Sequence, residues 1–369
     1  MKIQSRSSLL ILVMLFASAH NANAQHYVER EISIPWTHAL PNGLDALLVY
    51  AELPGKHPLA VITHGSSRDP KLHAEVSAWQ ELPHALWFAR RGWVALVVVR
   101  RGYGTSGGED DGRHSGHCPQ TDYESGAEYA AEDLRVAIDY ARKLPEVDGT
   151  RVIAMGVSTG GFATVALTAR PPRGLVAAIN FAGGRGSVAD HDVCNSENLV
   201  HAYRDFGKRS RVPMLWIYAQ NDKFFWPELA EKFDAAFRSQ GGQDQFILAP
   251  AIGDDGHTLF RHLEAWAPTV EDFLKAHNLA PLAEPLPEIK PPKISPPIAM
   301  SGDELHSFES YLLLGPHKAF AASPRSFGFS TAQMTPEEAR KKALENCSNA
   351  SHGTETCTVV SIDNVNVRQ

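Results

Sequence analysis

Short apolar runs alternate with longer amphipathic stretches between about residue 27 and residue 277. The later runs, such as Val94–Val99, are continuously apolar, which is typical of strands buried on both faces of a parallel sheet. The runs predict strands at Tyr27–Ile34, Leu44–Ala51, Leu59–Thr63, Val94–Val99, Arg151–Met155, Val176–Phe181, Met214–Ala219 and Gln245–Leu248. Helices are predicted at Glu75–Arg91, Tyr123–Leu144, Gly160–Arg170, Pro227–Gln240 and Leu259–His277. This alternation predicts a doubly wound, mostly parallel, eight-stranded α/β sheet whose first two strands, joined without a helix, are antiparallel.

A proline-rich stretch follows the last of these helices. Residues 280–299 carry seven prolines between Pro281 and Pro297, so they predict a semi-rigid linker between a large domain at 25–279 and a small α+β domain at 300–369. In the small domain, Lys318–Ser323 and Ser326–Ser330 predict a hairpin. A capping box that begins at Thr335 predicts a helix to about Cys347, and Cys357–Ile362 predicts a final strand.

The N-terminus has the pattern of a secretory signal peptide. Two basic residues precede the apolar run Leu9–Phe16, and Ala22–Ala24 offers a small-x-small cleavage site. We predict that residues 1–24 are removed and that the protein is secreted or periplasmic. The alternative is an uncleaved membrane anchor, but the run falls short of the ~20 residues that span a bilayer.

The bulk composition excludes some partners. The chain has 369 residues, 43% of them hydrophobic, and a formal net charge of −7, so no basic surface for nucleic acid is predicted. No later segment is apolar enough to predict a membrane span, and nothing in the sequence specifies an oligomeric state.

The stretch Arg113–Cys118 has a His-x-x-His-Cys pattern, but no second ligand cluster completes a zinc site. We therefore expect no metal and no organic cofactor.

The four cysteines all lie in the predicted mature chain. An even number in an exported protein favours disulfides, and three pairings are formally possible. We favour Cys118–Cys194, because each lies in a long loop that leaves the carboxyl end of a strand (Gly104–Thr121 and Gly183–Arg211). We also favour Cys347–Cys357, which would tie the end of the last helix to the final strand of a domain with a thin core.

The pentapeptide Gly-x-Ser-x-Gly occurs twice, at Gly104–Gly108 and Gly156–Gly160. Acidic residues and glycine follow the first match, and no helical pattern begins there. The second match follows an apolar strand and runs directly into a helical pattern, as a nucleophile elbow requires. The N-terminus of that helix would point toward a developing oxyanion. We predict Ser158 as the nucleophile in preference to Ser106; the alternative is a serine in an ordinary strand–helix turn.

An acid and a histidine should follow the nucleophile in that order. Asp222 comes just after the predicted strand Met214–Ala219, and His257 lies in the loop after the next strand. Loops at the carboxyl ends of parallel strands collect the site of such a sheet. Asp254 and Asp255 compete with Asp222, but side chains so near His257 in sequence would struggle to reach its imidazole from behind.

The oxyanion hole is predicted from two backbone N–H groups. One belongs to Thr159, next to the nucleophile, and the other to Ser66, in the loop that follows the third strand. Gly65 would let this loop approach the site closely. His64 precedes the nucleophile, so we predict a structural role for it.

These motifs resemble the dienelactone hydrolase and prolyl-oligopeptidase branch of the α/β hydrolases over roughly residues 27–277. The residues that carry the resemblance are His64-Gly65, Arg101–Gly108, Gly156–Gly160, Asp222 and His257. The resemblance implies a Ser158–Asp222–His257 triad, with Arg101–Gly108 as structural support beneath it. True dienelactone hydrolases use a cysteine nucleophile, and prolyl oligopeptidases carry a β-propeller that is absent here. The C-terminal domain is similar to small disulfide-bonded domains of exported bacterial proteins that have an Ala-Phe-Ala hairpin, which implies no activity.

Three functions remain open from the sequence. The first is hydrolysis of a carboxylic ester through an acyl-enzyme, the second is a peptidase or amidase on the same triad, and the third is an inactive hydrolase that binds the cell envelope. The two long loops contain polar residues such as His114, Arg185 and Arg204 and few large apolar groups. This composition favours a small polar ester or the end of a peptide over a lipid as the substrate. The alternative is that these charged side chains are simply solvated and do not contact the substrate.

Overall fold

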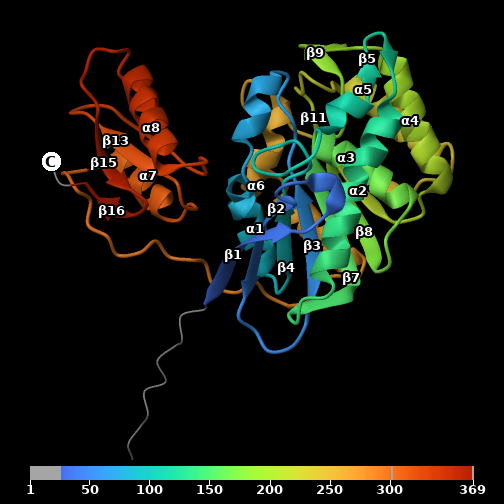
Figure 1. Cartoon of the computed structure of the whole chain (residues 1–369), viewed down its shortest axis with the longest axis horizontal. Helices are drawn as coiled ribbons and strands as arrows, with labels where there is room; N and C mark the ends of the chain where they lie inside the picture. The colour runs from blue at the N-terminus through green and yellow to red at the C-terminus, as the bar shows by residue number, and fades with distance from the viewer. Residues whose placement is uncertain (1–25, 301, 368–369) are drawn as a thin grey trace, which may run out of the picture.

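A computed structural model describes residues 26–300 and 302–367. Its larger part is built on an eight-stranded sheet (Figure 1). In spatial order the strands are β1 (Tyr27–Ile34), β2 (Leu44–Ala51), β4 (Val94–Val98), β3 (His57–Thr63), β7 (Val147–Val157), β8 (Leu175–Phe181), β11 (Met214–Ala219) and β12 (Asp244–Ala249). Only β1 and β2 run antiparallel to their neighbours; all other pairs are parallel. The predicted mostly parallel sheet is confirmed, and so is the antiparallel first pair.

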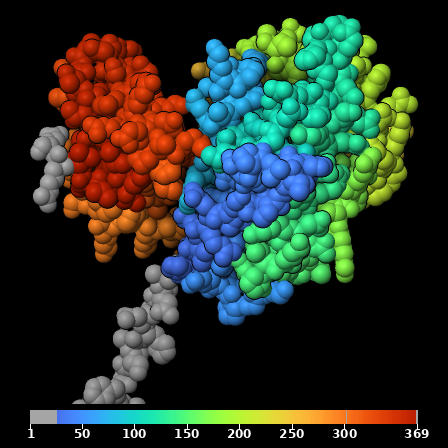
Figure 2. All heavy atoms as spheres, viewed as in Figure 1, coloured from blue at the N-terminus to red at the C-terminus, as the bar shows by residue number. Residues whose placement is uncertain are grey.

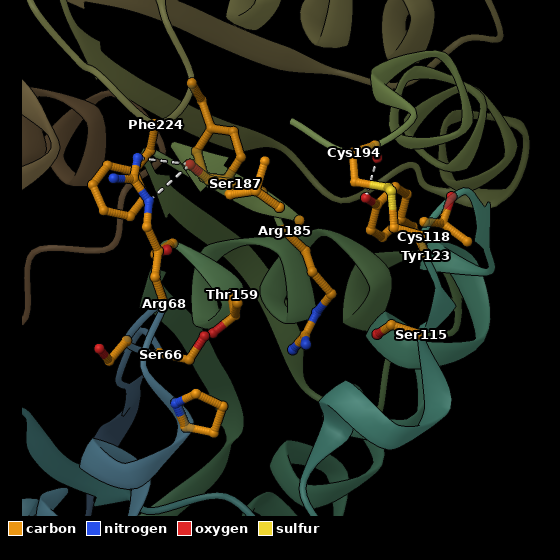
Figure 3. Close-up of a pocket in the computed structure, with 18 of the residues that line it drawn as sticks. Ser66, Arg68, Ser115, Cys118, Tyr123, Thr159, Arg185, Ser187, Cys194 and Phe224 are labelled. Atoms are coloured by element: carbon orange, nitrogen blue, oxygen red, sulfur yellow. Dashed lines mark hydrogen bonds between the residues drawn. A yellow bond between two sulfur atoms is a disulfide. The ribbon is translucent and has the colours of Figure 1, made fainter. Parts of the chain in front are cut away.

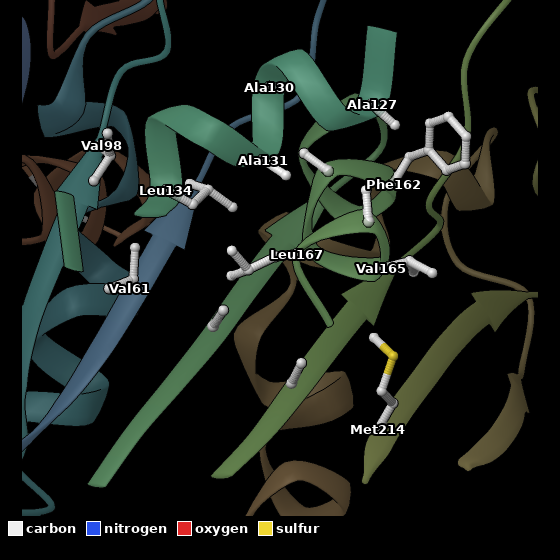
Figure 4. Packing of buried hydrophobic residues seen from close by; sticks show 14 of the residues in the cluster. Val61, Val98, Ala127, Ala130, Ala131, Leu134, Phe162, Val165, Leu167 and Met214 are labelled. Atoms are coloured by element: carbon white, nitrogen blue, oxygen red, sulfur yellow. The ribbon is translucent and has the colours of Figure 1, made fainter. Parts of the chain in front are cut away.

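Each face of the sheet has its own core, because alternate residues of a strand point to opposite faces. Val61 and Val98 point to the face covered by α2 (Tyr123–Ala141), α3 (Thr159–Ala169), α4 (Ser196–Arg209) and α5 (Pro227–Arg238). Figure 4 shows α2 packing its small residues against α3 above the strands. Ile62 and Val97 point to the other face, covered by α1 (Leu82–Ala89) and α6 (Leu263–Ala276). With helices on both faces, the sheet is doubly wound.

Two of the predicted helices begin later than their patterns indicate. At the start of the predicted helix Glu75–Arg91, Glu75 ends a 3-10 turn (Pro70–Glu75) and Ala78–Glu81 form another. Helix α1 starts only at Leu82, with a proline in its first turn. Proline lacks an N–H and fits best in the first turn of a helix, so Pro83 favours a helix that starts at Leu82. Likewise, Gly256–Arg261 is a separate 3-10 helix, and α6 begins at Leu263.

The loop predicted at Gly183–Arg211 is in large part helical. It contains the hairpin β9 (Ser187–Ala189) and β10 (Asp192–Val193), then α4. The Cys118–Cys194 disulfide is present, and it joins this segment to the small hairpin β5 (Gly116–His117) and β6 (Gln120–Thr121). The prediction missed α4 because its apolar positions are few: the helix is amphipathic, with a polar outer face, and buries only one side.

The C-terminal part of the chain has its own sheet and core. Its elements are α7 (Gly302–Leu312), β13 (Ala319–Ala322), β14 (Phe327–Ser330), α8 (Pro336–Ala350), β15 (Thr358–Ile362) and β16 (Val365–Asn366). The hairpin β13–β14 is as predicted, and Thr335 caps α8 by accepting a hydrogen bond from the Glu338 N–H at 3.2 Å. The Cys347–Cys357 disulfide is also present. Helix α7 and strand β16 had not been predicted.

Figure 2 shows this C-terminal part as a separate lobe. Between α6 and α7 the described chain has no helix or strand, although the Leu286 N–H donates a hydrogen bond to the Arg90 carbonyl of the large domain at 2.7 Å. An ion pair between Lys342 and Glu75 joins the two lobes at 2.9 Å. Within residues 26–300 and 302–367, no helix combines the length and the apolarity needed to cross a bilayer. The predicted signal peptide, residues 1–24, lies outside the described residues.

Candidate active site

Ser158 lies at the sharp turn between β7 and α3. Its backbone has φ 55° and ψ −122°, a conformation that L-residues rarely adopt and that functional sites impose on a few of them. Glycines make the turn possible: a Cβ at Gly156 would lie 2.3 Å from the Gly160 carbonyl oxygen, and one at Gly160 would lie 2.3 Å from the His64 carbonyl oxygen. Such distances leave no room for a side chain, so positions 156 and 160 must be glycine.

His257 and Asp222 form a hydrogen-bonded pair. His257 Nδ1 lies 3.1 and 3.2 Å from the two carboxylate oxygens of Asp222, which is fully buried. The backbone N–H groups of Phe224 and Phe225 donate to Asp222 Oδ1 at 2.8 and 2.9 Å, which fixes the carboxylate. The Phe224 ring stacks on the His257 ring with centroids 4.0 Å apart. The imidazole is therefore held in one plane by its acid and by an aromatic face.

Ser158 and His257 line the same cleft, but no hydrogen bond joins them among the described residues. In enzymes without substrate, hydrogen bonds between nucleophile and base are often long and tighten when substrate binds. The structure thus brings the three predicted triad residues to the carboxyl edge of the sheet and pairs two of them directly.

Two further residues hold the histidine loop, and neither was predicted. Asn221 Oδ1 accepts a hydrogen bond from the Ile252 N–H at 3.0 Å, and its Nδ2 donates to the carbonyls of Ile252 and Gly253 at 3.1 Å. Asp255 Oδ1 accepts from the backbone N–H of Lys223 and of His257, each at 3.0 Å. Asp255 thus acts as a cap that joins the two loops. Its position before a short helix was the only sequence signal for this role.

The two predicted oxyanion donors face the same cleft as Ser158. Neither the Ser66 N–H nor the Thr159 N–H makes a hydrogen bond within the described chain, so both are free to bind an oxyanion. A Cβ at Gly65 would lie 3.0 Å from the Ser158 Cβ, which explains the glycine in this loop. The loop that carries Gly65 and Ser66, which we call the oxyanion loop, therefore lies too close to Ser158 to accept a side chain at position 65 without a shift of either.

A buried arginine supports both sides of this arrangement. Arg100 donates to Thr159 Oγ1 and to Thr63 Oγ1 at 2.9 Å each, and also to the His64 carbonyl. The Arg100 N–H donates to His64 Nε2 at 3.0 Å. Burial and the Arg100 guanidinium hold the pKa of His64 well below its usual range, so the ring is neutral. These contacts agree with a structural role for His64.

Ser106, in the other pentapeptide, is used by the backbone. Its hydroxyl donates to the Val99 carbonyl at 2.7 Å and accepts from the Asp45 N–H at 2.8 Å. It lines neither cleft that contains Ser158.

Two clefts meet at Ser158. The first, of about 290 Å³, is closed by the Cys118–Cys194 disulfide and is lined by Tyr123, Thr159 and Arg185; we call it the disulfide-side cleft (Figure 3). The second, of about 630 Å³, is the histidine-side cleft and is lined by residues that include His257, Phe260, Arg261 and Leu72. Within the described chain, no group of three or more His, Cys, Asp or Glu side chains is arranged to hold a metal ion.

Arg68 marks the boundary between the two clefts and lines both. Its guanidinium lies 3.6 Å above the Phe224 ring and donates to Ser187 Oγ, to the Ala189 carbonyl and to Asp190. Figure 3 shows this side chain reaching the hairpin β9–β10. The contacts tie the oxyanion loop to the hairpin and divide the space around Ser158 in two.

The comparison with known families agrees with this geometry. Residues 81–257 match the model of the Dienelactone hydrolase family. They form a dienelactone hydrolase family domain. The matched segment begins just before α1 and ends at His257, so it includes Ser158 and Asp222. Its α/β-hydrolase fold is that of the sheet described above.

Solved structures of similar fold include an acylaminoacyl peptidase of Pyrococcus horikoshii, an esterase of Pyrococcus furiosus and acetyl xylan esterase 1 of a Thermoanaerobacterium species. They are 17%, 15% and 17% identical to this chain and cover 68%, 68% and 69% of it, with TM-scores of 0.49, 0.47 and 0.46. The chain covers 41%, 93% and 88% of these proteins, respectively. No curated protein matches the sequence.

Proposed function

We propose that this chain is an exported serine hydrolase that cleaves a carboxylic ester through an acyl-enzyme, with Ser158 as nucleophile, His257 as base and Asp222 as orienting acid. The observation that carries the proposal is the strained turn that presents Ser158, at φ 55°, to a cleft shared with the Asp222-paired His257. The unused N–H groups of Ser66 and Thr159 line the adjoining cleft, which Ser158 also lines.

In this mechanism, His257 takes the Ser158 proton as the hydroxyl attacks the ester carbonyl. The N–H groups of Ser66 and Thr159 stabilise the negative charge that develops on the carbonyl oxygen. His257 then gives its proton to the leaving alcohol, and water hydrolyses the acyl-enzyme by the same steps in reverse. Asp222 holds the Nδ1–H tautomer throughout, since its carboxylate faces Nδ1.

Labelling of the purified mature protein with a fluorophosphonate tests this proposal. We expect label only on the peptide that contains Ser158, and loss of labelling in Ser158→Ala and in His257→Ala. Turnover should fall roughly 10⁴-fold or more in Ser158→Ala. The Ser106→Ala variant is the matched control and should label normally. A folded protein that is not labelled would overturn the proposal and favour an inactive hydrolase that binds the envelope.

Matched ester and amide substrates separate esterase from peptidase. We expect esters to turn over faster than amides with the same acyl group; comparable rates would assign the triad to a peptidase or amidase.

The export part of the proposal has a separate test. Two disulfides are compatible with an oxidising compartment. We expect the mature protein from an exporting host to begin at Gln25, after cleavage behind Ala24. Its intact mass checks this, and a retained N-terminus would support an uncleaved anchor instead.

A further inference from the structure

We propose that the disulfide-side cleft is an acyl-binding subsite for short acyl groups that end in a carboxylate, with Arg185 as the residue that recognises the carboxylate. The substrates would be half-esters of small dicarboxylic acids. The inference rests on the proposed ester hydrolysis at Ser158 and adds the class of substrate to it.

The position of His257 decides which cleft receives the acyl group. The general acid must reach the oxygen of the leaving alcohol, so the alcohol has to lie on the side of the imidazole. His257 lines the histidine-side cleft and does not line the disulfide-side cleft. The acyl chain, on the other side of the scissile bond, is therefore directed into the disulfide-side cleft.

The charge of the disulfide-side cleft favours an anion. Its lining includes Arg68, His73 and Arg185, and no aspartate or glutamate is among the described residues that line it. Arg68 is already paired with Asp190 at 3.0 Å. Arg185 is the cation nearest the closed end, and in Figure 3 its guanidinium lies between Thr159 and Ser115.

Arg185 lines this cleft and, within the described chain, has a buried polar atom without a partner. It is 9% exposed, its Nη2 pairs with Asp111, and its Nε has no hydrogen-bond partner in the described structure. Asp111 also faces Arg100, whose Nε lies 3.4 Å from the same carboxylate. Although burial raises the pKa of a carboxyl group, the two guanidinium groups hold the pKa of Asp111 well below its usual range. One negative charge thus faces two positive charges, and the buried cluster has one positive charge in excess.

The size of the cleft limits the acyl group. At about 290 Å³ it is at the lower end for ligand pockets. Its far wall is fixed by the Cys118–Cys194 disulfide and by Tyr123, whose hydroxyl donates to the Cys194 carbonyl. A wall that is held covalently cannot easily open for a long chain, so a short diacid fits better than a fatty acyl group.

The histidine-side cleft has the opposite character. It is larger, at about 630 Å³, and its lining includes Glu75, Glu81 and Asp255 together with Arg68 and Arg261. A carboxylate on the alcohol part of the substrate would meet these acidic groups. The two clefts therefore predict that the effect of a negative charge depends on which side of the ester carries it.

Two matched pairs of esters test the proposal with the full mature chain. The first pair is ethyl hydrogen succinate and ethyl succinamate. Their acyl groups differ only at the end, which is a carboxylate in the former and a neutral amide in the latter. In the second pair, carboxymethyl butyrate and carbamoylmethyl butyrate carry the same difference on the alcohol. In the first pair we expect kcat/KM to be about 10- to 100-fold higher for the ester with the carboxylate, which is the effect of one hydrogen bond between charged groups. In the second pair we expect the carboxylate to give no advantage.

Variants then assign the preference to Arg185. In Arg185→Gln the ratio within the first pair should fall to near one, mainly through a higher KM for ethyl hydrogen succinate. Arg185→Lys should recover part of the ratio. Arg204→Gln is the matched control, because Arg204 is an exposed arginine of α4 that does not line the cleft. It should leave the ratio unchanged.

The wild-type ratios alone can overturn the inference, whether or not the Arg185 variants fold. Equal or faster hydrolysis of ethyl succinamate would do so, and so would a carboxylate preference confined to the second pair. An enzyme that labels at Ser158 with a fluorophosphonate but hydrolyses neither succinate ester would refute this inference and leave the proposed function intact. Absence of labelling would instead refute the proposed function.

Discussion

Ser106 and Ser158 share a five-residue pattern but differ in what their hydroxyls contact. Ser106 Oγ makes two backbone hydrogen bonds, to Val99 and from Asp45. Ser158 Oγ makes none among the described residues and faces both clefts. The difference comes from the segment that follows each serine, since a helix begins directly after Ser158 and none begins after Ser106. A strand–turn–helix context therefore identifies the candidate nucleophile where the pentapeptide alone does not.

Replacement of Ser106 by alanine should lower stability and leave the chemistry unchanged. The substitution leaves the Asp45 N–H and the Val99 carbonyl without their partner, at a cost of about 1–3 kcal/mol. For a domain of this size we expect the Tm to fall by several degrees, measured by thermal unfolding, while kcat changes less than threefold. A loss of kcat comparable to that of Ser158→Ala, in a variant that is still folded, would contradict the assignment.

Asp222 and Asp255 both lie near His257, and substitution should separate their roles. In Asp222→Asn the amide can stabilise the wrong imidazole tautomer, so kcat should fall roughly 10⁴-fold. In Asp255→Asn the side chain can still accept hydrogen bonds as a helix cap, so kcat should fall less than tenfold. Steady-state kinetics of the two variants checks this, and similar losses in both would show that Asp255 shares the role of Asp222.

At the scale of elements, the strands and the loops that carry the candidate triad were predictable, because both depend on local patterns. Continuously apolar runs marked buried strands, and the loops after them located Asp222 and His257. The amphipathic helix α4 and the late start of α1 were missed, since the first has few apolar positions and the second depends on Pro83. The contacts of Arg100 and Asn221 join segments far apart in the sequence, so no local pattern could predict them.

The packing of α5 against β12 places two carboxylates together. Burial and the neighbouring Asp234 raise the pKa of Asp244 to about 8. Because this value is above the ordinary 3.8, the folded protein binds more protons than the unfolded chain between about pH 4 and pH 8. The stability contributed by the protonated group is present below about pH 4 and is lost as the pH rises through 8.

Asp244→Asn should therefore stabilise the protein only at high pH. We expect its Tm to exceed that of the wild type by a few degrees at pH 8.5, and the difference to vanish near pH 4, as measured by thermal unfolding across this range. The matched control is Asp272→Asn, at an exposed position of α6, which should shift the Tm little at either pH. A Tm difference that did not change with pH would mean that the substitution acts through packing rather than through the charge.

For the whole molecule, the hydrolase domain and the C-terminal lobe differ in how they are stabilised. The first has two large apolar cores on either side of its sheet, whereas the second has only two small clusters; each of the two parts holds one disulfide. All residues that form the candidate active site belong to the first. We therefore expect hydrolysis not to require the C-terminal lobe. The contacts of the segment between the lobes predict where the chain can be truncated without loss of stability.

Truncation should show that the catalytic domain extends into the proline-rich segment. The Arg90 Nε donates to the Leu286 carbonyl at 3.0 Å, and the Arg90 carbonyl accepts from the Leu286 N–H at 2.7 Å. Leu282 packs against Gly92, where a Cβ would lie only 2.8 Å from the Leu282 Cγ. A chain ending at Ile289 keeps these contacts, so its Tm and kcat/KM should stay close to those of the full mature chain. A chain ending at Leu279 loses them and exposes apolar surface around Trp93, so its Tm should fall by several degrees. Equal stability of both truncations would show that the segment is only a spacer, whereas loss of activity in the longer one would assign the C-terminal lobe a part in catalysis.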